Sequence, residues 1–395
     1  MTKALSNIRV LDLSRVLAGP YCTMILGDLG TDVIKVEAPG GSDETRQWGP
    51  PYANGESAYF LCANRNKRAI TLDLKSEEGR RILKELIVKS DVVIENFKHG
   101  TMKKWGLDEE SLNELNPKII HCSITGFGKN GPYKHLPGYD FIIQALGGLM
   151  SITGSEESGP LKVGVAISDI LTGLYSAIGI LAAINERNQS HEGQSIDISL
   201  LDSQVSALVN VASNYLISGR NPKRLGNEHP NIVPYQLFNT SDGEMVIAVG
   251  NDRQFTRLCN VLELPKVPAA PKFSTNPNRI QNRDQLIALL SERIKQKTTK
   301  EWCKILDDSG IPCGPINSIK EVFEDPQVKS RGMVIDLEHP KAGTIKVVGS
   351  PLKLSRTPVE VRRHPPLPGE HTEEVLNEIG YTLNDIKDLK HKNII

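Results

Sequence analysis

The chain has 395 residues, with 47 Lys and Arg against 47 Asp and Glu and a formal net charge of zero. This length suits two or three domains, and the balanced charge, with no long run of one sign, disfavours nucleic acid or an anionic membrane surface as a partner. The six cysteines show neither C-x-x-C nor metal-ligand spacing, which predicts reduced thiols and no metal site.

The beginning of the chain lacks the apolar segment of a signal peptide. The longest apolar run falls short of the ~20 residues that a membrane span needs and is broken by Thr172, Tyr175 and Ser176. We therefore expect a cytoplasmic protein without a membrane partner.

The first 130 residues alternate short strands rich in branched side chains with helical segments. Strands are predicted over residues 8–14, 32–37, 69–74, 91–97 and 119–128, and helices over residues 18–30 and 76–90, the second with Ser76 as its N-cap. This βαβ alternation predicts an α/β fold with a parallel sheet covered by helices.

The character of the sequence changes after residue 216. Residues 217–234 are rich in Pro, Gly and Asn without an apolar period, which predicts a linker between residues 1–216 and a smaller mixed domain over 235–320. That domain should open with a hairpin whose turn is Asp242–Gly243. Residues 321–395 follow, and "GEHTEEVLNEIG" predicts a short helix near the C-terminus.

One glycine motif raises the possibility of a nucleotide site. "GFGKNG" (126–131) matches G-x-G-x-x-G and follows a predicted strand, but Pro132 prevents the immediate helix that would hold a pyrophosphate. A structural or substrate-contacting loop is the better interpretation. There is no G-x-S-x-G and no histidine pair with ligand spacing, which disfavours Ser-His-Asp and metal chemistry.

A lone acid, Asp169, lies near the start of the apolar run. Ser168 and Asp169 occupy positions typical of an N-cap and a first-turn acid, so ordinary capping is one interpretation. The following helix is apolar nearly all round and is therefore expected to be buried. A carboxylate at its mouth then needs a partner or a chemical role, and nucleophilic attack is the second interpretation.

Many motifs in order show a resemblance to a known family. They are "VLDLSRVLAGP", "LGDLGTDVIKVEAPG", "NRNKRAITLDLKSEEG", "DVVIENF", "SITGFGKNGP", "GYDFIIQALGGLM", the "SD" of residues 168–169, "GIPCGPI" and "PGEHTEEVL". On these residues the chain resembles the class III (CaiB/BaiF) CoA-transferases, a group that includes formyl-CoA transferase, carnitine CoA-transferase and alpha-methylacyl-CoA racemase.

The resemblance implies a fold and a reaction. The fold is a Rossmann-like large domain built from both chain ends, with residues 321–395 returning to it, a smaller mixed α/β domain, and an interlocked homodimer. The reaction uses Asp169 as the nucleophile, through an aspartyl anhydride and an aspartyl-CoA thioester. Coenzyme A esters and free carboxylic acids are then the substrates, and no cofactor is required.

The resemblance also implies binding residues. The positions that match CoA contacts are Leu17, Ala18, Leu72, Lys75, Asn96, Phe97, Lys104 and Tyr139. A basic residue that binds phosphate in formyl-CoA transferase is replaced here by Ala38, so Arg65 or Lys67 is a candidate to replace it.

The substrates are suggested by the branch that the chain is most similar to, which moves CoA from succinyl-CoA to short dicarboxylates such as glutarate. A second carboxylate needs a cation, and Arg15 and Arg46 are the candidates, with Asp140 also placed at the substrate site. No histidine stands beside Asp140, which disfavours racemisation. Formyl-CoA:oxalate or carnitine-type transfer, racemisation and a silent CoA-binding scaffold remain the alternatives.

Overall fold

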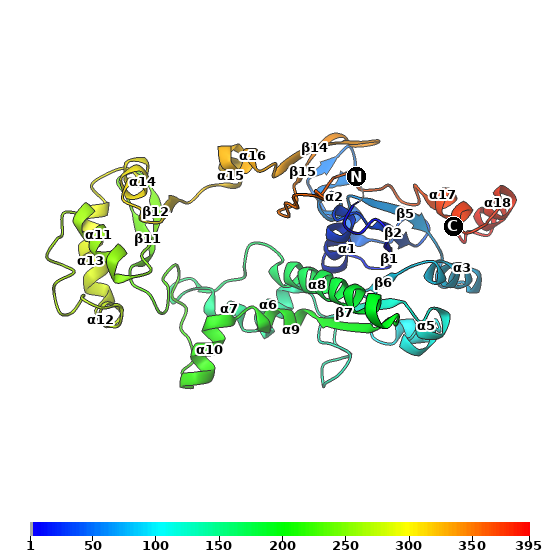
Figure 1. Ribbon diagram of the computed structural model, residues 1–395, viewed down its shortest axis with the longest axis horizontal. Helices are drawn as coiled ribbons and strands as arrows, with labels where there is room; N and C mark the ends of the chain where they lie inside the picture. The colour runs from blue at the N-terminus through cyan, green and yellow to red at the C-terminus, as the bar shows by residue number, and fades with distance from the viewer. Residues whose placement is uncertain (1–2) are drawn as a thin grey trace. The chain divides into compact units, whose positions relative to one another are not determined.

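The protein divides into two compact units in the computed structural model, which describes residues 3–395 (Figure 1). Unit 1 comprises the chain up to residue 149, residues 162–219 and residues 327–395. Unit 2 comprises residues 150–161 and 220–326. Unit 1 is therefore assembled from three separate stretches of sequence, which include both ends of the chain.

Unit 1 is built on a six-stranded sheet with the order β10-β7-β6-β1-β2-β5, in which every neighbouring pair is parallel. The strands are β1 (Arg9–Asp12), β2 (Asp32–Glu37), β5 (Lys67–Thr71), β6 (Val92–Glu95), β7 (Ile120–Thr125) and β10 (Ser195–Ser199). The predicted α/β fold with a parallel central sheet is confirmed.

Helices cover both faces of this sheet, because alternate strand residues point to opposite sides. Val10 and Val33 pack on one side, with α1 (Ala18–Asp28), α6 (Asp140–Leu146), α8 (Ile167–Ser190) and α9 (Leu200–Ser206). Leu11 and Ile34 pack on the other, with α3 (Glu77–Val88), α5 (Glu109–Leu115), α17 (Thr372–Glu378) and α18 (Leu383–His391). Figure 1 shows α17 close to β5, so the C-terminal part of the chain covers this end of the sheet.

The expectation that α8 is buried all round is wrong. It packs on α1, β7 and β10, yet Ile178 is 60% exposed and Leu174 and Tyr175 are 40% and 39% exposed. In the described part of the chain, α8 is the single helix long and apolar enough to cross a membrane by length and composition. One of its faces lies in the core of unit 1, and the described residues of that unit leave the other face exposed.

Several local predictions are confirmed. Ser76 caps α3 by accepting a hydrogen bond from the amide of Gly79. The glycine loop after β7 leads to no helix before α6 begins at Asp140, and the loop closes tightly, since a Cβ on Gly126 would lie 2.6 Å from the Cα of Gly138. That close approach gives the glycines of "GFGKNG" a structural reason.

Unit 2 opens with the predicted antiparallel hairpin, in which Asn239 of β11 (Tyr235–Asn239) faces Glu244 of β12 (Glu244–Ala248). A third strand, β13 (Cys313–Pro315), pairs with β12. The hydrophobic core of unit 2 includes Phe238, Phe255 and Trp302. The helices of the unit are α11 (Asp252–Val261), α12 (Asn276–Gln281), α13 (Arg283–Ile294), α14 (Thr299–Asp308) and α15 (Ile319–Glu324).

The remaining elements are short or lie near the periphery. They are η1 (Glu44–Gln47), β3 (Tyr52–Ala53), β4 (Glu56–Ser57), α2 (Ala58–Ala63), α4 (Thr101–Lys104), α7 (Leu149–Ile152), β8 (Gly154–Ser155), β9 (Gly159–Pro160), α10 (Val209–Ser218), α16 (Pro326–Ser330), β14 (Val334–His339) and β15 (Gly343–Val348).

Candidate active site

Asp169 lies in the first turn of α8, against the beginning of α1. Gly173, one helical turn further along the same face, lies so close to α1 that a Cβ on it would stand 2.7 Å from the carbonyl oxygen of Ala18. Because side chains tilt toward the N-terminus of their helix, Asp169 points toward the beginning of α8. A bulkier residue at 173 would push the two helices apart.

The first turn of α1 has no side-chain cap. Leu17 is its N-cap and its side chain makes no capping hydrogen bond. Val16 and Leu17, directly before the helix, lie in a hydrogen-bonded turn. The positive end of a helix with free N–H groups stabilises negative charge nearby. The predicted residues Leu17 and Ala18 are thus brought next to the helix that carries Asp169.

Asp140, the first residue of α6, takes the capping role that the sequence suggested for Ser168. Its Oδ1 accepts hydrogen bonds from the amides of Ser168 (2.7 Å) and Asp169 (3.4 Å), and its Oδ2 accepts one from Gln144 Nε2 (2.8 Å). The Ser168 hydroxyl instead donates to Gln204 Oε1 at 2.7 Å. Asp169 therefore stands in a first turn that a different acid already caps.

The carboxyl of Asp169 has no cationic partner among the described residues. Burial raises its pKa, and the negative charge of Asp140 adds to this, so that the pKa reaches about 7. A carboxylate without a cation or a strong donor is more nucleophilic than one that is paired. The geometry therefore favours the chemical role of Asp169 over simple capping.

Tyr59 in α2 is a site residue that sequence reasoning missed. Burial raises the pKa of this phenol to about 12, and among nearby charges that of Asp169 contributes most, followed by Cys62 and Asp140. Its ring meets Trp48 edge-on with centroids 5.1 Å apart. Ser57 is an N-cap residue that indicates a helix over α2, but nothing in the sequence indicates that this helix brings the Tyr59 phenol toward Asp169.

The crevice at the carboxyl ends of β1 and β6 gathers other predicted residues. The strand order reverses there, and ligands of open parallel sheets bind at such a point. The Arg15 amide donates to Asn96 Oδ1 at 2.9 Å, and Asn96 Nδ2 donates back to the Arg15 carbonyl at 2.8 Å. Phe97 follows directly and packs edge-on against Trp105. Arg15, Asn96 and Phe97 thus lie together at the carboxyl ends of β1 and β6, and Leu17 and Ala18 follow closely after β1.

The two arginines predicted to bind a second carboxylate differ in availability. Arg15 pairs with the exposed Glu44 at 2.9 Å, and its buried Nε has no partner. Arg46 donates to both carboxylate oxygens of the buried Glu37, donates to the Pro366 carbonyl at 3.2 Å, and stacks on Phe60 at 3.7 Å. Arg15 has donor capacity to offer, whereas Arg46 is already occupied.

Four other predicted contacts make no direct interaction with Asp169 among the described residues. The side chain of Leu72 is 1% exposed and packs in the core beneath α3. Lys75, Lys104 and Tyr139 are exposed. None of these four makes a hydrogen bond or ion pair with Asp169 or Asp140 among the described residues. Tyr139 is the N-cap of α6 and directly precedes Asp140.

The suggestion that Arg65 or Lys67 supplies a phosphate contact is wrong. Arg65 is bound to Asp28 at 2.6 Å and to the Val348 carbonyl at 2.7 Å. Lys67, with no exposed side-chain surface, donates to Asp12 (3.1 Å), the Pro20 carbonyl (2.9 Å) and Asn64 (2.8 Å). Tertiary partners that the sequence does not reveal have taken up both cations.

Lys67 belongs to a buried charge network beneath the crevice. Asp12 also accepts hydrogen bonds from the hydroxyls of Ser14 and Thr23. Lys35 donates to the Ser14 carbonyl and to Asp43 Oδ2, each at 2.9 Å, and Asp43 Oδ1 accepts the amide of Val16 at 3.2 Å. The network therefore holds the backbone of residues 14–16, which leads from β1 into α1.

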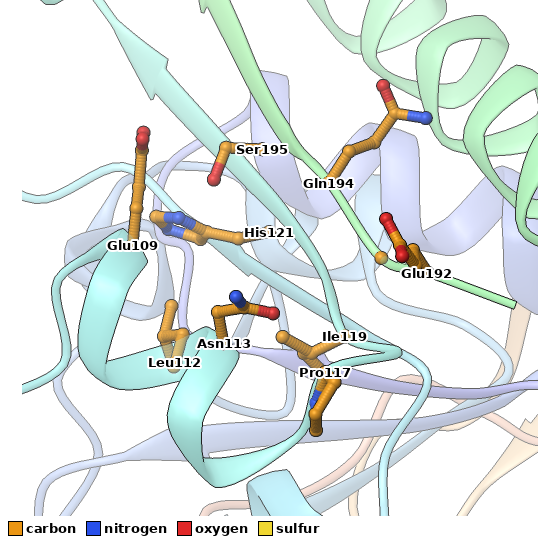
Figure 2. A pocket seen from close by; sticks show the side chains of 10 residues that line it. Glu109, Leu112, Asn113, Pro117, Ile119, His121, Glu192, Gln194 and Ser195 are labelled. Atoms are coloured by element: carbon orange, nitrogen blue, oxygen red, sulfur yellow. The ribbon is translucent and has the colours of Figure 1, made fainter. Parts of the chain in front are cut away.

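A cavity of about 430 Å³ lies elsewhere in unit 1, beside α5, β7 and β10 (Figure 2). Figure 2 shows His121 between Glu109 and Ser195, and neither ring nitrogen of His121 has a hydrogen-bond partner. Asp169 is not among the lining residues. Across the described residues, no group of three or more His, Cys, Asp or Glu side chains could hold a metal ion.

Comparison with known proteins defines the class. Residues 5–372 match CoA-transferase family III, and the chain belongs to this family. It is therefore a family III CoA-transferase, an enzyme, as the sequence motifs predicted.

Two relatives and one solved structure show how close the likeness is. The chain is 47% identical to succinyl-CoA:glutarate CoA-transferase of Mus musculus over 95% of this chain and 86% of that protein. It is 48% identical to succinate–glutarate CoA-transferase of Agrobacterium fabrum over 95% of each chain. A crystal structure of a CAIB/BAIF family protein from Brucella suis, 46% identical, superposes with a TM-score of 0.85 over 96% of this chain and 100% of that one.

Proposed function

We propose that this enzyme transfers CoA from succinyl-CoA to glutarate or a closely similar short dicarboxylate. The names of the mouse and Agrobacterium relatives support this choice of substrates. The observation that carries the chemistry is Asp169, a partly buried carboxylate without a cationic partner among the described residues, on a helix that packs against α1. Its reaction partners are an acyl-CoA and a free carboxylic acid, with no cofactor.

The mechanism begins with attack of an Asp169 carboxylate oxygen on the thioester carbonyl of succinyl-CoA. The carbon–sulfur bond breaks, leaving a succinyl-aspartyl anhydride and CoA thiolate. The thiolate then attacks the Asp169 carbonyl, which forms an aspartyl-CoA thioester and releases succinate. Glutarate attacks this thioester and expels the thiolate. The thiolate finally attacks the glutaryl carbonyl of the new anhydride, giving glutaryl-CoA and restoring the Asp169 carboxylate.

Each tetrahedral intermediate places negative charge on a carbonyl oxygen. The positive end of α1, which has no side-chain cap, suits this charge. Tyr59 is uncharged at neutral pH even at its ordinary pKa, and burial and the charge of Asp169 raise that pKa further, to about 12, so its hydroxyl remains a donor. Both features act without a metal or nucleotide.

The distal carboxylate of the dicarboxylate requires a cation in a closing crevice. Arg15 meets this need, because its Nε is free and its present partner, Glu44, is an exposed side chain that a substrate carboxylate could replace. The crevice that Arg15 shares with Asn96 and Phe97 accommodates the CoA arm in this proposal, with Leu17, Ala18, Leu72, Lys75, Lys104 and Tyr139 as further contacts.

We also propose that two chains form an interlocked homodimer in the cytoplasm. Four helices of unit 1, α6, α8, α9 and α10, carry large apolar side chains that are exposed. They are Phe141, Leu146, Ile178, Val205, Val209, Leu216 and Ile217. Exposed apolar surface of this extent needs a cover. The strand order of the sheet, which reads 3-2-1-4-5-6 in chain order from β5 to β10, supports a Rossmann-like description of unit 1.

Trapping the intermediate tests the proposal. Incubation with succinyl-CoA followed by hydroxylamine should convert Asp169 to its hydroxamate, which peptide mass spectrometry would locate. Purified enzyme should also form glutaryl-CoA from succinyl-CoA and glutarate. A label on another residue would move the nucleophile, and failure to use any dicarboxylate acceptor would reject the substrates.

A further inference from the structure

Asp140 occupies the amides that an acid in the first turn of α8 would ordinarily use. Its Oδ1 lies 2.7 Å from the amide nitrogen of Ser168 and 3.4 Å from that of Asp169. Asp140 is 28 and 29 residues earlier in the chain and belongs to another helix, α6. Two carboxylates therefore lie at the first turn of α8. That of Asp140, from α6, accepts hydrogen bonds, and that of Asp169 accepts none among the described residues.

We propose that Asp140 is a positioning residue that keeps Asp169 reactive, by occupying the N-terminal amides of α8 and placing a second negative charge beside the nucleophile. This inference rests on the proposed role of Asp169. It assigns Asp140 no contact with the reacting atoms, in contrast to the substrate-binding role that the sequence suggested for it.

The energetics of a helix N-terminus give the reason. Free amides and the positive end of the helix dipole stabilise a nearby carboxylate and make it a weaker base and nucleophile. Asp140 satisfies these donors, so they are not available to Asp169. In addition, two like charges close together disfavour ionisation of the second group, and the raised pKa of Asp169 agrees with this, although burial is its largest cause.

The charge of Asp140 is fixed in place from its far side. Gln144, fully buried one turn along α6, donates from Nε2 to Asp140 Oδ2 at 2.8 Å. Gln144 Oε1 accepts the amide of Val163 at 2.9 Å, which fixes the orientation of the amide group. Both oxygens of Asp140 are therefore in use, and a substrate would have to displace a buried partner to reach them.

The titratable groups around Asp169 lie on several elements. The charge of Asp169 raises the pKa of Tyr59 on α2. The other elements that pack on α8 carry Tyr21, Cys22 and Asp28 on α1, Asp202 on α9, His121 and Cys122 on β7 and Asp197 on β10. The pKa of Asp169 responds to none of these. Asp140 is thus the single neighbouring charge whose removal should move the titration of the nucleophile.

The test is the pH dependence of kcat/KM in Asp140→Asn. The asparagine oxygen can still accept the amides of Ser168 and Asp169, but the charge is gone. We expect the acid limb, near pH 7 in the native enzyme, to move down by about one pH unit, and kcat at pH 8.5 to fall several-fold because the nucleophile is a weaker base. Asp140→Ser, which also caps without charge, should shift the limb in the same direction and covers the case in which the asparagine variant folds poorly.

Gln144→Met is the matched control, because it removes a hydrogen bond to Asp140 without removing a charge. It should lower stability and leave the acid limb within a few tenths of a pH unit. The proposal is overturned if Asp140→Asn and Asp140→Ser keep the native limb, or if Gln144→Met shifts it as far. Hydroxylamine trapping distinguishes the role of Asp140 from that of Asp169. If Asp169 is trapped but the acid limb of the Asp140 variants does not move, only the role of Asp140 is rejected. If the native enzyme gives no trapped Asp169, its role as the nucleophile is rejected.

Discussion

Two aspartates in unit 1 show opposite fates for a carboxylate taken out of water. Asp12 is completely buried, yet the nearby cations Lys67 and Lys35 and the hydroxyls of Ser14 and Thr23 overcome the effect of burial and lower its pKa to about 2. Asp169 is only partly buried but has no cation, and burial together with Asp140 raises its pKa to about 7. The same side chain serves structure in one place and supports chemistry in the other.

The difference lies in the partners rather than in depth. A buried charge that is paired and hydrogen-bonded is compatible with a stable fold, and its loss leaves the partner charge uncompensated. A carboxylate left without such partners costs stability, and a strongly perturbed pKa of this kind is typical of functional sites. Variants that remove, unpair or retune these two carboxylates therefore separate stability from activity.

Asp169→Asn should have the largest effect on activity. It preserves shape but removes the nucleophile, so kcat should fall by at least about 10³-fold, with circular dichroism and CoA binding close to native. Steady-state formation of glutaryl-CoA measures this. Asp202→Asn, which changes an exposed first-turn acid of α9, is the control and should retain activity. Near-native turnover of Asp169→Asn would contradict covalent catalysis.

Lys67→Met should have the largest effect on stability. It leaves Asp12 buried beside only one remaining cation, so the free energy of unfolding should fall by about 3–5 kcal/mol. Urea denaturation followed by fluorescence measures the loss. Lys346→Met, which breaks an exposed pair with Asp336, should cost less than about 1 kcal/mol. Equal losses in the two variants would show that the buried network contributes no more than a surface pair.

Arg15→Met should change acceptor selectivity. Loss of a charged hydrogen bond of about 1.5–3 kcal/mol predicts a roughly 10- to 150-fold fall in kcat/KM for glutarate. Monocarboxylic acids, which lack the distal carboxylate, should lose much less. Arg46→Met should instead lower the melting temperature, because it leaves the buried Glu37 unpaired, with the ratio of di- to monocarboxylate turnover unchanged. If Arg46→Met changed that ratio and Arg15→Met did not, the roles of the two arginines would be reversed.

The smallest effects are those of pH. If Asp169 reacts as the carboxylate, as proposed, its pKa of about 7 predicts that kcat/KM rises with pH up to about pH 7 and levels off above it. The stability linked to the raised pKa of Asp169 is present below its ordinary value of 3.8 and is lost as pH rises through 7. Asp169→Asn should therefore melt about 2 °C or more above the native protein at pH 8 and close to it at low pH.

Asp12 behaves with the opposite sign. Its folded pKa of about 2 lies below the ordinary 3.8, so its stabilising effect is present above pH 3.8 and is lost as pH falls toward 2. A plot of melting temperature against pH for the native protein, Asp169→Asn and Lys67→Met would show whether each aspartate affects stability in its own pH range.

Local signals in the sequence predicted the parallel sheet, the cap of α3 and the hairpin of unit 2, because hydrophobic period and turn chemistry act over a few neighbouring residues. Local signals did not define the role of Asp169. The sequence pattern was compatible with both capping and catalysis, and the resemblance to the CoA-transferases was needed to favour catalysis. Asp140, the acid that actually caps α8, lies 28 residues before Ser168, beyond the reach of any local rule.

The arginines and the lysine illustrate the same limit. Arg15 and Arg46 look alike in sequence, and only the fold shows that Glu37 and Phe60 occupy one of them. Lys67 was a reasonable candidate for phosphate until the structure placed it on Asp12. Whether a charge is available depends on its tertiary neighbours, which composition and spacing do not define. The exposed face of α8 escaped prediction for a related reason, since apolar residues all round a helix do not reveal how much of it one chain covers.

The way the C-terminal segment completes the sheet has a consequence for synthesis on the ribosome. The Ala69 amide of β5 donates to His371, the Thr71 amide donates to Thr372, and the Asp73 amide donates to the Ile394 carbonyl. The hydrogen bonds at this edge therefore cannot form until residues 371–394 have left the exit tunnel. Residues 220–326 of unit 2, which form one continuous stretch, emerge earlier. The strand β5 thus awaits a segment made long after it, and translation that stops before residue 371 leaves the edge of β5 open to association with other chains.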